Sequence, residues 1–456
     1  MIQTSLTEYQ YELNLVADLF PQASELPLHY TAKQEGKTLT GTLQGGGEEF
    51  TFTQTLPDCD ELHFKRLEKR FHKLAVYRAL KTLTGHQPAW GALTGIRPVK
   101  LAYMEQELGH DPLSFLQNEM DVTQEKVQVV KEILQEQEGI YQKGDENYNL
   151  FVSIPFCPTK CVYCSFISAE IGKCQKFIDP YVDAVCKEIE DAKSYAWPLR
   201  SVYVGGGTPV SLDNEHLERV LAAIGKVDCE YTVEAGRPDC ITEENLALLK
   251  KYGVTRICVN PQSFSDETLR LIGRKHTAQD IFDKYALAKS FGFDVNMDFI
   301  AGLPGETLQG FLQSMDIVCN LAPENVTVHT LSLKKGSALK EKTTRLEEGE
   351  VGDMVQGAYD RLRKAGYFPY YLYRQKYMAG NLENTGFTKT GKACVYNVDI
   401  MEETSPIVAC GANAVSKRVF NDVGRIERYA SPKDFNTYFA KLDQIIQEKK
   451  LFFTQK

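Results

Sequence analysis

Three cysteines, Cys157, Cys161 and Cys164, have the spacing Cys-x3-Cys-x2-Cys and follow the apolar run 151–156. Thiolates on one short loop can bind three irons of a 4Fe–4S cluster. A cluster held entirely by protein commonly has four cysteine ligands, so three ligands leave one iron open for a small molecule, as catalytic metal sites do. The spacing therefore predicts a 4Fe–4S cluster with an exchangeable position.

The alternative interpretations of these cysteines are a structural zinc site and thiols in a core. Zinc sites usually show two separated Cys or His pairs. Cys174 and Cys186 lie downstream, but neither forms a second close pair, so the motif favours a cluster. We interpret most of the scattered cysteines as small apolar side chains; they are Cys59, Cys174, Cys186, Cys229, Cys240, Cys258, Cys319, Cys394 and Cys410.

Composition limits the kinds of protein this chain can be. A length of 456 residues predicts two or three domains, and a net charge of −9 argues against a nucleic-acid surface. No apolar run approaches the ~18 residues of a membrane span, and the start, Met1-Ile-Gln-Thr-Ser, has no secretory signal pattern. Twelve cysteines without an export signal indicate reduced thiols or metal ligands, not a disulfide framework. We therefore expect a cytoplasmic protein with no nucleic-acid partner and no membrane span.

The secondary-structure pattern changes at about residue 149. Residues 1–55 are turn-rich with alternating stretches, and helices are predicted at 60–86 and 123–138. From 149 onward strands alternate with helices, which predicts an α/β fold: a partial (β/α)6 barrel with a parallel sheet covered by helices. The predicted strands are 149–155, 201–204, 231–235, 255–260, 294–300 and 326–331.

These patterns predict three domains. An N-terminal α+β accessory domain covers 1–145, and the barrel core covers 146–340. A mainly helical C-terminal domain, 341–456, has predicted helices at 346–365 and 432–449 and is expected to cover the substrate. Ligands of parallel α/β sheets gather at the carboxyl ends of the strands, so the site is expected there.

Several polar or glycine motifs follow the predicted strands. The triple glycine of Gly205-Gly-Gly-Thr-Pro209, taken alone, is usually a tight turn, but glycines also let backbone amides approach a carboxylate. Glu234 ends a predicted strand and could bond a ribose hydroxyl or an amine, whereas an isolated Glu is more often at the surface. Gln262 and Arg274 flank a helix beginning at Ser265, and Asp298 ends another strand; each alone favours a structural role.

Together, the cysteine triplet and the glycine loop ~40 residues later resemble the radical S-adenosylmethionine (SAM) superfamily. The resemblance implies that the open iron chelates the amino and carboxylate groups of SAM. An electron from the cluster then breaks the sulfonium bond and releases a 5′-deoxyadenosyl radical. The cofactor carries this chemistry and the protein positions it.

Residues ~149–420 resemble the oxygen-independent coproporphyrinogen III oxidase (dehydrogenase) family, and the whole chain resembles its HemZ-like branch. The motifs that carry this resemblance are Ile154-Pro-Phe-Cys-Pro-Thr-Lys-Cys-Val-Tyr-Cys, Gly205-Gly-Gly-Thr-Pro, Asn260-Pro-Gln-Ser-Phe, Ile272-Gly-Arg-Lys-His, Asp298-Phe-Ile-Ala-Gly-Leu-Pro-Gly, Tyr373-Arg-Gln-Lys376 and Gly380-Asn-Leu-Glu-Asn384.

The resemblance implies a site for two SAM molecules and a tetrapyrrole. Family members abstract hydrogen from two propionates of coproporphyrinogen III, and loss of carbon dioxide gives the vinyl groups of protoporphyrinogen IX. By matching position, the SAM on the cluster would be bordered by Phe151, Gly206, Glu234 and Val415. A second SAM would be bordered by Tyr163, Gly207, Thr208, Gln262, Arg274 and Asp298.

Further roles are implied for residues near the reacting groups. Phe151, Tyr163 and Arg274 would be catalytic, with Arg274 able to pair with a carboxylate. Arg374 and Lys376 could meet substrate propionates on grounds of charge. A flavodoxin- or ferredoxin-type protein would supply electrons.

The chain departs from typical decarboxylating members at three positions. They have Tyr and His where this chain has Phe151 and Ser153, and a fourth cysteine where it has Phe166. The Cys-Ser-Phe ending resembles the haem-trafficking relatives more. Three functions are therefore considered: radical decarboxylation of coproporphyrinogen III, haem delivery by a chaperone, and another radical SAM reaction on a tetrapyrrole, such as methyl transfer.

Overall fold

The computed structural model describes residues 1–454 except 96, 145–146, 167, 196, 333–336, 340–348, 376–377, 379–381 and 422–423. The chain forms two compact units, Met1–Lys131 and Glu132–Lys456. Helix α5 (Gln124–Glu136) contains the boundary between them. Among the described residues, no helix has the length and apolar character needed to cross a bilayer.

The first unit is a small α+β module, as the alternating stretches and the helix prediction indicated. Strand β1 (Ile2–Thr4) pairs in parallel with β2 (Leu28–Glu35), and β3 (Thr38–Gly45) and β4 (Glu48–Thr55) continue the sheet in antiparallel order. Helix α2 (Glu61–Thr84) packs Phe71 against Leu39 and Leu56 of this sheet region. The unit also contains α1 (Gln10–Ala17), α3 (Pro98–Glu107) and α4 (Pro112–Ser114).

The second unit is built on one eleven-stranded sheet of described residues, with the order β13-β14-β12-β11-β10-β9-β8-β5-β15-β16-β17. The predicted strands are confirmed and are parallel neighbours within it. They are β5 (Tyr148–Ile154), β8 (Leu199–Gly206), β9 (Glu230–Gly236), β10 (Arg256–Val259), β11 (Asp294–Ala301) and β12 (Asn325–Thr330).

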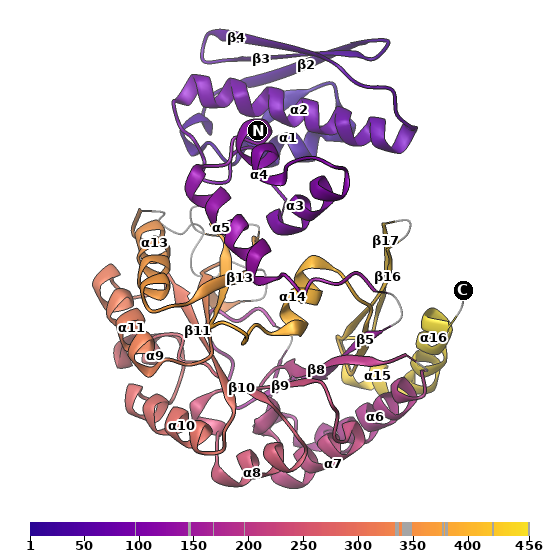
Figure 1. The fold of residues 1–456 in the computed structure, drawn as a ribbon, viewed down its shortest axis with the longest axis vertical. Coiled ribbons are helices and arrows are strands. Elements are labelled where there is room, and N and C mark those ends of the chain that lie inside the picture. Colours follow the sequence, from indigo (N-terminus) through magenta and orange to yellow (C-terminus); the bar gives the residue numbers. More distant parts are fainter. Residues whose placement is uncertain are drawn as a thin grey trace. The chain divides into compact units, whose positions relative to one another are not determined.

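Helices cover the outer face of this curved sheet (Figure 1). Side-chain caps fix where several of them begin: Thr242 and Asn245 form a capping box, and Ser265 accepts from the Thr268 amide. The helices are α6 (Gln175–Lys193), α7 (Asn214–Ile224), α8 (Glu243–Lys251), α9 (Asp266–Leu271), α10 (Ala278–Ser290) and α11 (Leu308–Leu321).

The C-terminal residues contribute strands as well as helices. The predicted helix 346–365 corresponds to α13 (Gly349–Lys364), and the predicted final helix 432–449 is divided at Lys441 into α15 (Phe435–Ala440) and α16 (Leu442–Thr454). Helix α14 (Val395–Glu402) was not predicted. The sheet is extended at both edges by β13 (Phe368–Tyr373), β14 (Asn384–Thr388), β15 (Ile407–Cys410), β16 (Val415–Phe420) and β17 (Arg425–Ala430).

These strands show that the C-terminal segment, which we expected to form a mainly helical domain, also belongs to the central sheet. Strand β15 pairs in parallel with β5, and β14 pairs with β12. The apolar run 407–410 is completely buried, so it gains more from joining the central sheet than from a separate helical layer. The C-terminal segment therefore shares a sheet with the predicted core, and the division into three domains remains a prediction.

Candidate functional site

The three cysteines lie on a loop that follows the short strand β6 (Phe156–Cys157), which pairs with β7 (Ala169–Glu170). Side chains from other elements hold this loop. Arg237, after β9, donates from Nη1 to Thr159 Oγ1 at 2.7 Å, and Asp239 binds the same guanidinium at 2.7 Å. The Val162 amide donates to the Ile272 carbonyl at 3.1 Å.

The donor set of this loop fits a cluster. Burial raises the pKa of the Cys157 and Cys164 thiols, while the positive charge of Arg237 favours the Cys157 thiolate. No three His, Cys, Asp or Glu side chains among the described residues converge on a single metal ion.

The glycine loop packs directly against the cysteine loop. A Cβ on Gly207 would lie 2.5 Å from the Phe156 carbonyl oxygen, so only glycine fits this approach. Gly206 has φ +98°, a conformation that also favours glycine. The Thr208 amide donates to the Phe156 carbonyl at 2.7 Å, and Thr208 Oγ1 donates to Cys157 Sγ at 3.5 Å.

Glu234 lies inside the barrel beside the glycine loop. Tyr203 donates its hydroxyl to Glu234 Oε1 at 2.6 Å. Burial raises the pKa of Glu234 to about 7, although the hydrogen bond from Tyr203 lowers it. Strand β9 continues two residues beyond Glu234, to Gly236, so the prediction that this residue ends the strand was slightly wrong.

Asp298 lies within β11, which runs on to Ala301, so the prediction that it ends the strand was also wrong. Asn296 Nδ2 donates to Asp298 Oδ1 at 2.8 Å, and His329 Nε2 lies 3.9 Å from Oδ2. Although burial raises the pKa of Asp298, the hydrogen bond and charge of His329 hold that pKa below its usual value. Asp298 therefore remains ionised close to Glu234, whose pKa it raises.

Gln262 follows β10 in a left-handed conformation, with φ +69°. Its amide donates to the Asp298 carbonyl at 2.9 Å, and its carbonyl accepts from the Ile300 amide at 3.2 Å. The side chain is 5% exposed, and its Oε1 has no hydrogen-bond partner among the residues that the structure describes. An unpartnered buried oxygen of this kind is expected to accept a hydrogen bond from a ligand.

Arg274 and Tyr163 connect the cysteine loop to the end of β10. Arg274 Nη1 donates to the Asn260 carbonyl at 2.9 Å, and Nη2 donates to the Tyr163 hydroxyl at 3.2 Å. Burial raises the pKa of Tyr163, so its phenol stays protonated. The structure thus brings both predicted residues together on the cluster side of the barrel.

Phe151 lies on β5, and its ring stacks on Tyr203 at 6.3 Å and on Tyr396 at 6.2 Å. The turn that precedes Val415 lies beside the end of β5, because Ser153 Oγ donates to the Ala412 carbonyl at 3.2 Å. Val415 itself is 41% exposed at the start of β16.

Tyr203 and Arg237 are residues near the site that sequence reasoning missed. Tyr203 precedes Gly205 by two residues on the same strand and therefore shares its face, which is the signal that could have identified it. Arg237 directly follows the strand that carries Glu234. Arg374 is buried, and burial lowers its pKa to about 10. Lys376 lies outside the described residues.

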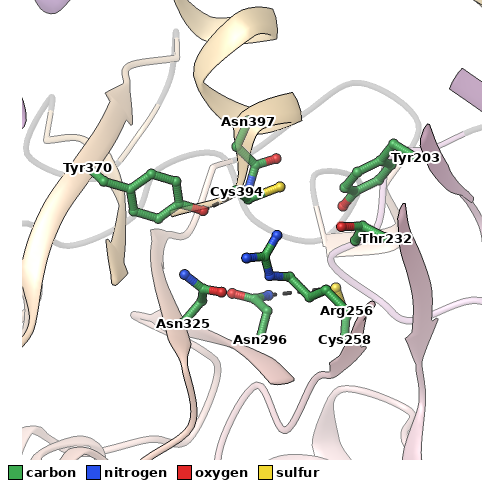
Figure 2. Close-up of a pocket in the computed structure, with 9 residues that line it drawn as sticks. All are labelled: Tyr203, Thr232, Arg256, Cys258, Asn296, Asn325, Tyr370, Cys394 and Asn397. Carbon is green, nitrogen blue, oxygen red and sulfur yellow. Dashed lines mark hydrogen bonds between the residues drawn. The ribbon is translucent and has the colours of Figure 1, made fainter. Parts of the chain in front are cut away.

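A small pocket occupies the barrel interior nearer the amino ends of the strands. Figure 2 shows Arg256 in its centre, facing side chains from β12, β13 and α14. Arg256 pairs with Glu230 at 2.5 Å, and Glu230 accepts from the Val395 and Tyr396 amides that begin α14. The pocket has room for about one water molecule. This polar packing closes the amino end, whereas the predicted site residues lie toward the carboxyl ends.

Comparison with known proteins agrees with this geometry. The family model of the radical SAM superfamily matches residues 151–318. The oxygen-independent coproporphyrinogen-III oxidase-like protein HemZ of Bacillus subtilis (strain 168) is 36% identical over 480 residues, covering 97% of this chain and 95% of the relative. The heme chaperone HemW of the same organism is 34% identical over 190 residues, covering 40% of this chain and 49% of that protein.

A solved structure shows the same fold. Coproporphyrinogen III oxidase (HemN) from Escherichia coli, a radical SAM enzyme, superposes with a TM-score of 0.53 and 22% identity, over 67% of this chain and 71% of that one. The radical SAM superfamily uses a 4Fe–4S cluster and SAM, which fits the thiol loop and the glycine loop described above. The chain therefore belongs to the HemZ-like family of oxygen-independent coproporphyrinogen-III oxidase-like proteins, within the radical SAM superfamily.

Proposed function

We propose that this protein is a radical SAM enzyme that oxidatively decarboxylates the propionates of coproporphyrinogen III to vinyl groups, giving protoporphyrinogen IX. Cys157, Cys161 and Cys164 hold the cluster. The observation that best supports the SAM site is the 3.5 Å contact between Thr208 Oγ1 and Cys157 Sγ, in which the glycine loop meets a residue proposed to bind the cluster. Similarity to HemZ over nearly the full chain supports the tetrapyrrole substrate.

Different residues around the cluster bind different parts of SAM. Gly206 and Gly207 bring backbone amides close to a carboxylate, and Glu234 accepts hydrogen bonds from the other polar groups of SAM. Phe151 supplies an apolar wall, and Val415 borders the same molecule from β16. When bound, the cluster and SAM supply the one-electron cleavage that lets deoxyadenosine carry away a propionate hydrogen.

A second SAM molecule would lie toward Tyr163, Gly207, Thr208, Gln262, Arg274 and Asp298. The buried, unpartnered Oε1 of Gln262 supports a ligand on this side. Arg274 is catalytic in this proposal because its planar guanidinium, held by Tyr163, faces a carboxylate of SAM or of the substrate. A flavodoxin- or ferredoxin-type donor supplies the electron that cleaves SAM, and the electron left by each loss of carbon dioxide passes to a one-electron acceptor.

The test is an anaerobic reaction of cluster-reconstituted protein with SAM, a reductant and coproporphyrinogen III, followed by mass spectrometry. Protoporphyrinogen IX together with deoxyadenosine is the expected result. Deoxyadenosine without porphyrinogen product would overturn the decarboxylase proposal. S-adenosylhomocysteine among the products would instead indicate methyl transfer.

A haem chaperone is the second candidate. Two observations favour it: the similarity to heme chaperone HemW, and Phe166, 67% exposed at the position where typical decarboxylating members have a fourth cysteine. This function predicts stable haem binding, with stoichiometric transfer to an acceptor protein and no consumption of coproporphyrinogen III. An absorption titration with haem distinguishes the two functions.

The affinity for SAM is expected to fall as the pH is lowered through about 7. Glu234 has a pKa raised to about 7 by burial, and protonation removes an acceptor that the ligand needs. Affinity should therefore be highest above that pH, where the carboxylate is ionised. Calorimetric titrations with SAM between about pH 6 and 8 check this. Glu234→Gln is the control and should abolish the change near pH 7.

Gly207→Ala is expected to weaken SAM binding at least tenfold while the protein stays folded. The new methyl group would lie 2.5 Å from a backbone oxygen, so the glycine loop must move away from the cysteine loop. Gly172→Ala is the matched control, because no atom lies within 4 Å of its added Cβ. Equal SAM affinities for the two variants would contradict the proposed packing.

A further inference from the structure

Tyr203 of β8 forms a hydrogen bond with Glu234 of the neighbouring strand β9 inside the barrel. Residue 203 is the register partner of Phe151 on the adjacent strand. Its ring stacks on Tyr396 at 4.4 Å, and the ring of Phe151 lies beside this pair, 6.3 Å from Tyr203 and 6.2 Å from Tyr396. Its hydroxyl donates to Glu234 Oε1 at 2.6 Å. The ring is thus packed against two other aromatic rings, while its hydroxyl donates to one oxygen of the carboxylate.

Gly205 makes this arrangement possible. A Cβ at residue 205 would lie 2.8 Å from Glu234 Oε2 and 3.0 Å from Tyr203 Cε1. Without that Cβ, Oε2 lies over the first glycine of the loop while Oε1 is fixed by the phenol. The carboxylate therefore has one oxygen fixed by Tyr203 and the other beside the glycine loop.

We propose that Tyr203 is a positioning residue, which fixes the orientation and the ionised state of Glu234 for SAM binding. The proposal rests on the SAM site proposed above, but the Tyr203–Glu234 link can be tested without SAM. Burial raises the pKa of Tyr203 well above its usual value, so the phenol remains a donor throughout the working pH range. Removing the Tyr203 hydroxyl deprives the ionised form of Glu234 of a hydrogen bond, which raises the pKa of Glu234 and favours its protonated form.

Other titratable groups also face Glu234 and must be separated from the effect of Tyr203. Asp298 from β11 raises the pKa of Glu234, and His329 from β12 lowers it. Glu234 also affects the pKa of Cys258 of β10 and of Tyr396 of α14. A test in a Glu234→Gln background removes the titration of Glu234 while leaving these groups in place.

The first experiment is a calorimetric SAM titration of the cluster-reconstituted full chain. Tyr203→Phe is expected to weaken SAM binding about tenfold near pH 7, and to move the midpoint of the pH profile upward by about one unit. In a Glu234→Gln background, Tyr203→Phe is expected to cause no further loss, because its target is gone. Additive losses in the double variant, or an unshifted midpoint, would overturn the proposal.

The second experiment uses cluster-free protein, so it does not depend on SAM. An infrared pH titration follows the carboxylic acid band of Glu234, assigned by its disappearance in Glu234→Gln. Tyr203→Phe is expected to raise the midpoint of this titration. Tyr370→Phe is the control and is expected to leave the midpoint unchanged. That variant also loses a buried hydroxyl, but the hydroxyl of Tyr370 accepts from Asn397 at 2.9 Å, whereas that of Tyr203 donates to Glu234.

The two experiments separate the inference from the function on which it rests. If the wild-type protein binds no SAM and the infrared midpoint still moves in Tyr203→Phe, the proposed SAM site is wrong but the control of Glu234 by Tyr203 stands. An identical midpoint in Tyr203→Phe and wild type refutes the inference, whatever the result with SAM.

Discussion

Cys161→Ser is expected to leave the protein folded but to abolish both the cluster and SAM cleavage. Cys161 is the middle one of the three predicted cluster ligands and is 9% exposed. A serine oxygen is a poor substitute for a thiolate on iron, and two remaining cysteines cannot retain a 4Fe–4S cluster firmly. The measurement combines iron content after anaerobic reconstitution with deoxyadenosine formation, which should fall to the level without enzyme.

The matched control is Cys174→Ser, which changes a partly exposed cysteine ten residues beyond the third predicted ligand. This variant should reconstitute and cleave SAM as the wild type does. Circular dichroism spectra of both variants should match that of the wild type, because neither side chain fills a large part of the core. Substantial SAM cleavage by Cys161→Ser would exclude the triplet as the source of the chemistry.

The parallel strands could be predicted from sequence because each is a short apolar run between a turn and a helix. The run 231–235, for example, precedes a helix that Thr242 caps, and it forms β9. The C-terminal strands were harder to predict. Strand β13 is Tyr-rich and β15 has only four residues, and what makes them strands is the neighbour each finds across the sheet.

The candidate site was predictable in a similar way. Residues that lie in a recognisable local motif, such as the cysteine triplet and the glycine loop, could be identified before the structure was known. Tyr203 lies outside such a motif; its place two residues before Gly205 puts it on the same face of the strand, but its role depends on a hydrogen bond to a residue 31 positions away. The same limit applies to the buried pair of Glu188 and Lys449, which are 261 residues apart.

This buried ion pair joins α16 to α6 and to the turn beside β5. Lys449 Nζ binds Glu188 Oε2 and donates to the Ala409 carbonyl at 2.8 Å, and the two residues are 1% and 2% exposed. Glu188 also accepts from the Gly411 amide at 3.1 Å. Although burial lowers the pKa of Lys449, Cys410 and Glu188 raise it overall, so the ammonium stays charged.

Lys449→Met is expected to lower the free energy of unfolding by about 3–5 kcal/mol. The variant keeps the apolar stem but leaves the carboxylate of Glu188 buried without its cation. Denaturant unfolding of the cluster-free protein measures the change. Lys450→Met is the control: this neighbour is 57% exposed, lies 3.9 Å from Asp191 and should cost less than about 1 kcal/mol.

A second variant identifies the cause of the loss. Glu188→Gln combined with Lys449→Met removes both charges, so it should recover part of the stability lost in Lys449→Met alone. If the double variant is less stable than Lys449→Met, lost packing rather than an uncompensated charge dominates. Because Glu188 holds the Gly411 amide, and Ser153 contacts the next residue of that turn, the single variant should also weaken SAM binding, and the double variant should weaken it less.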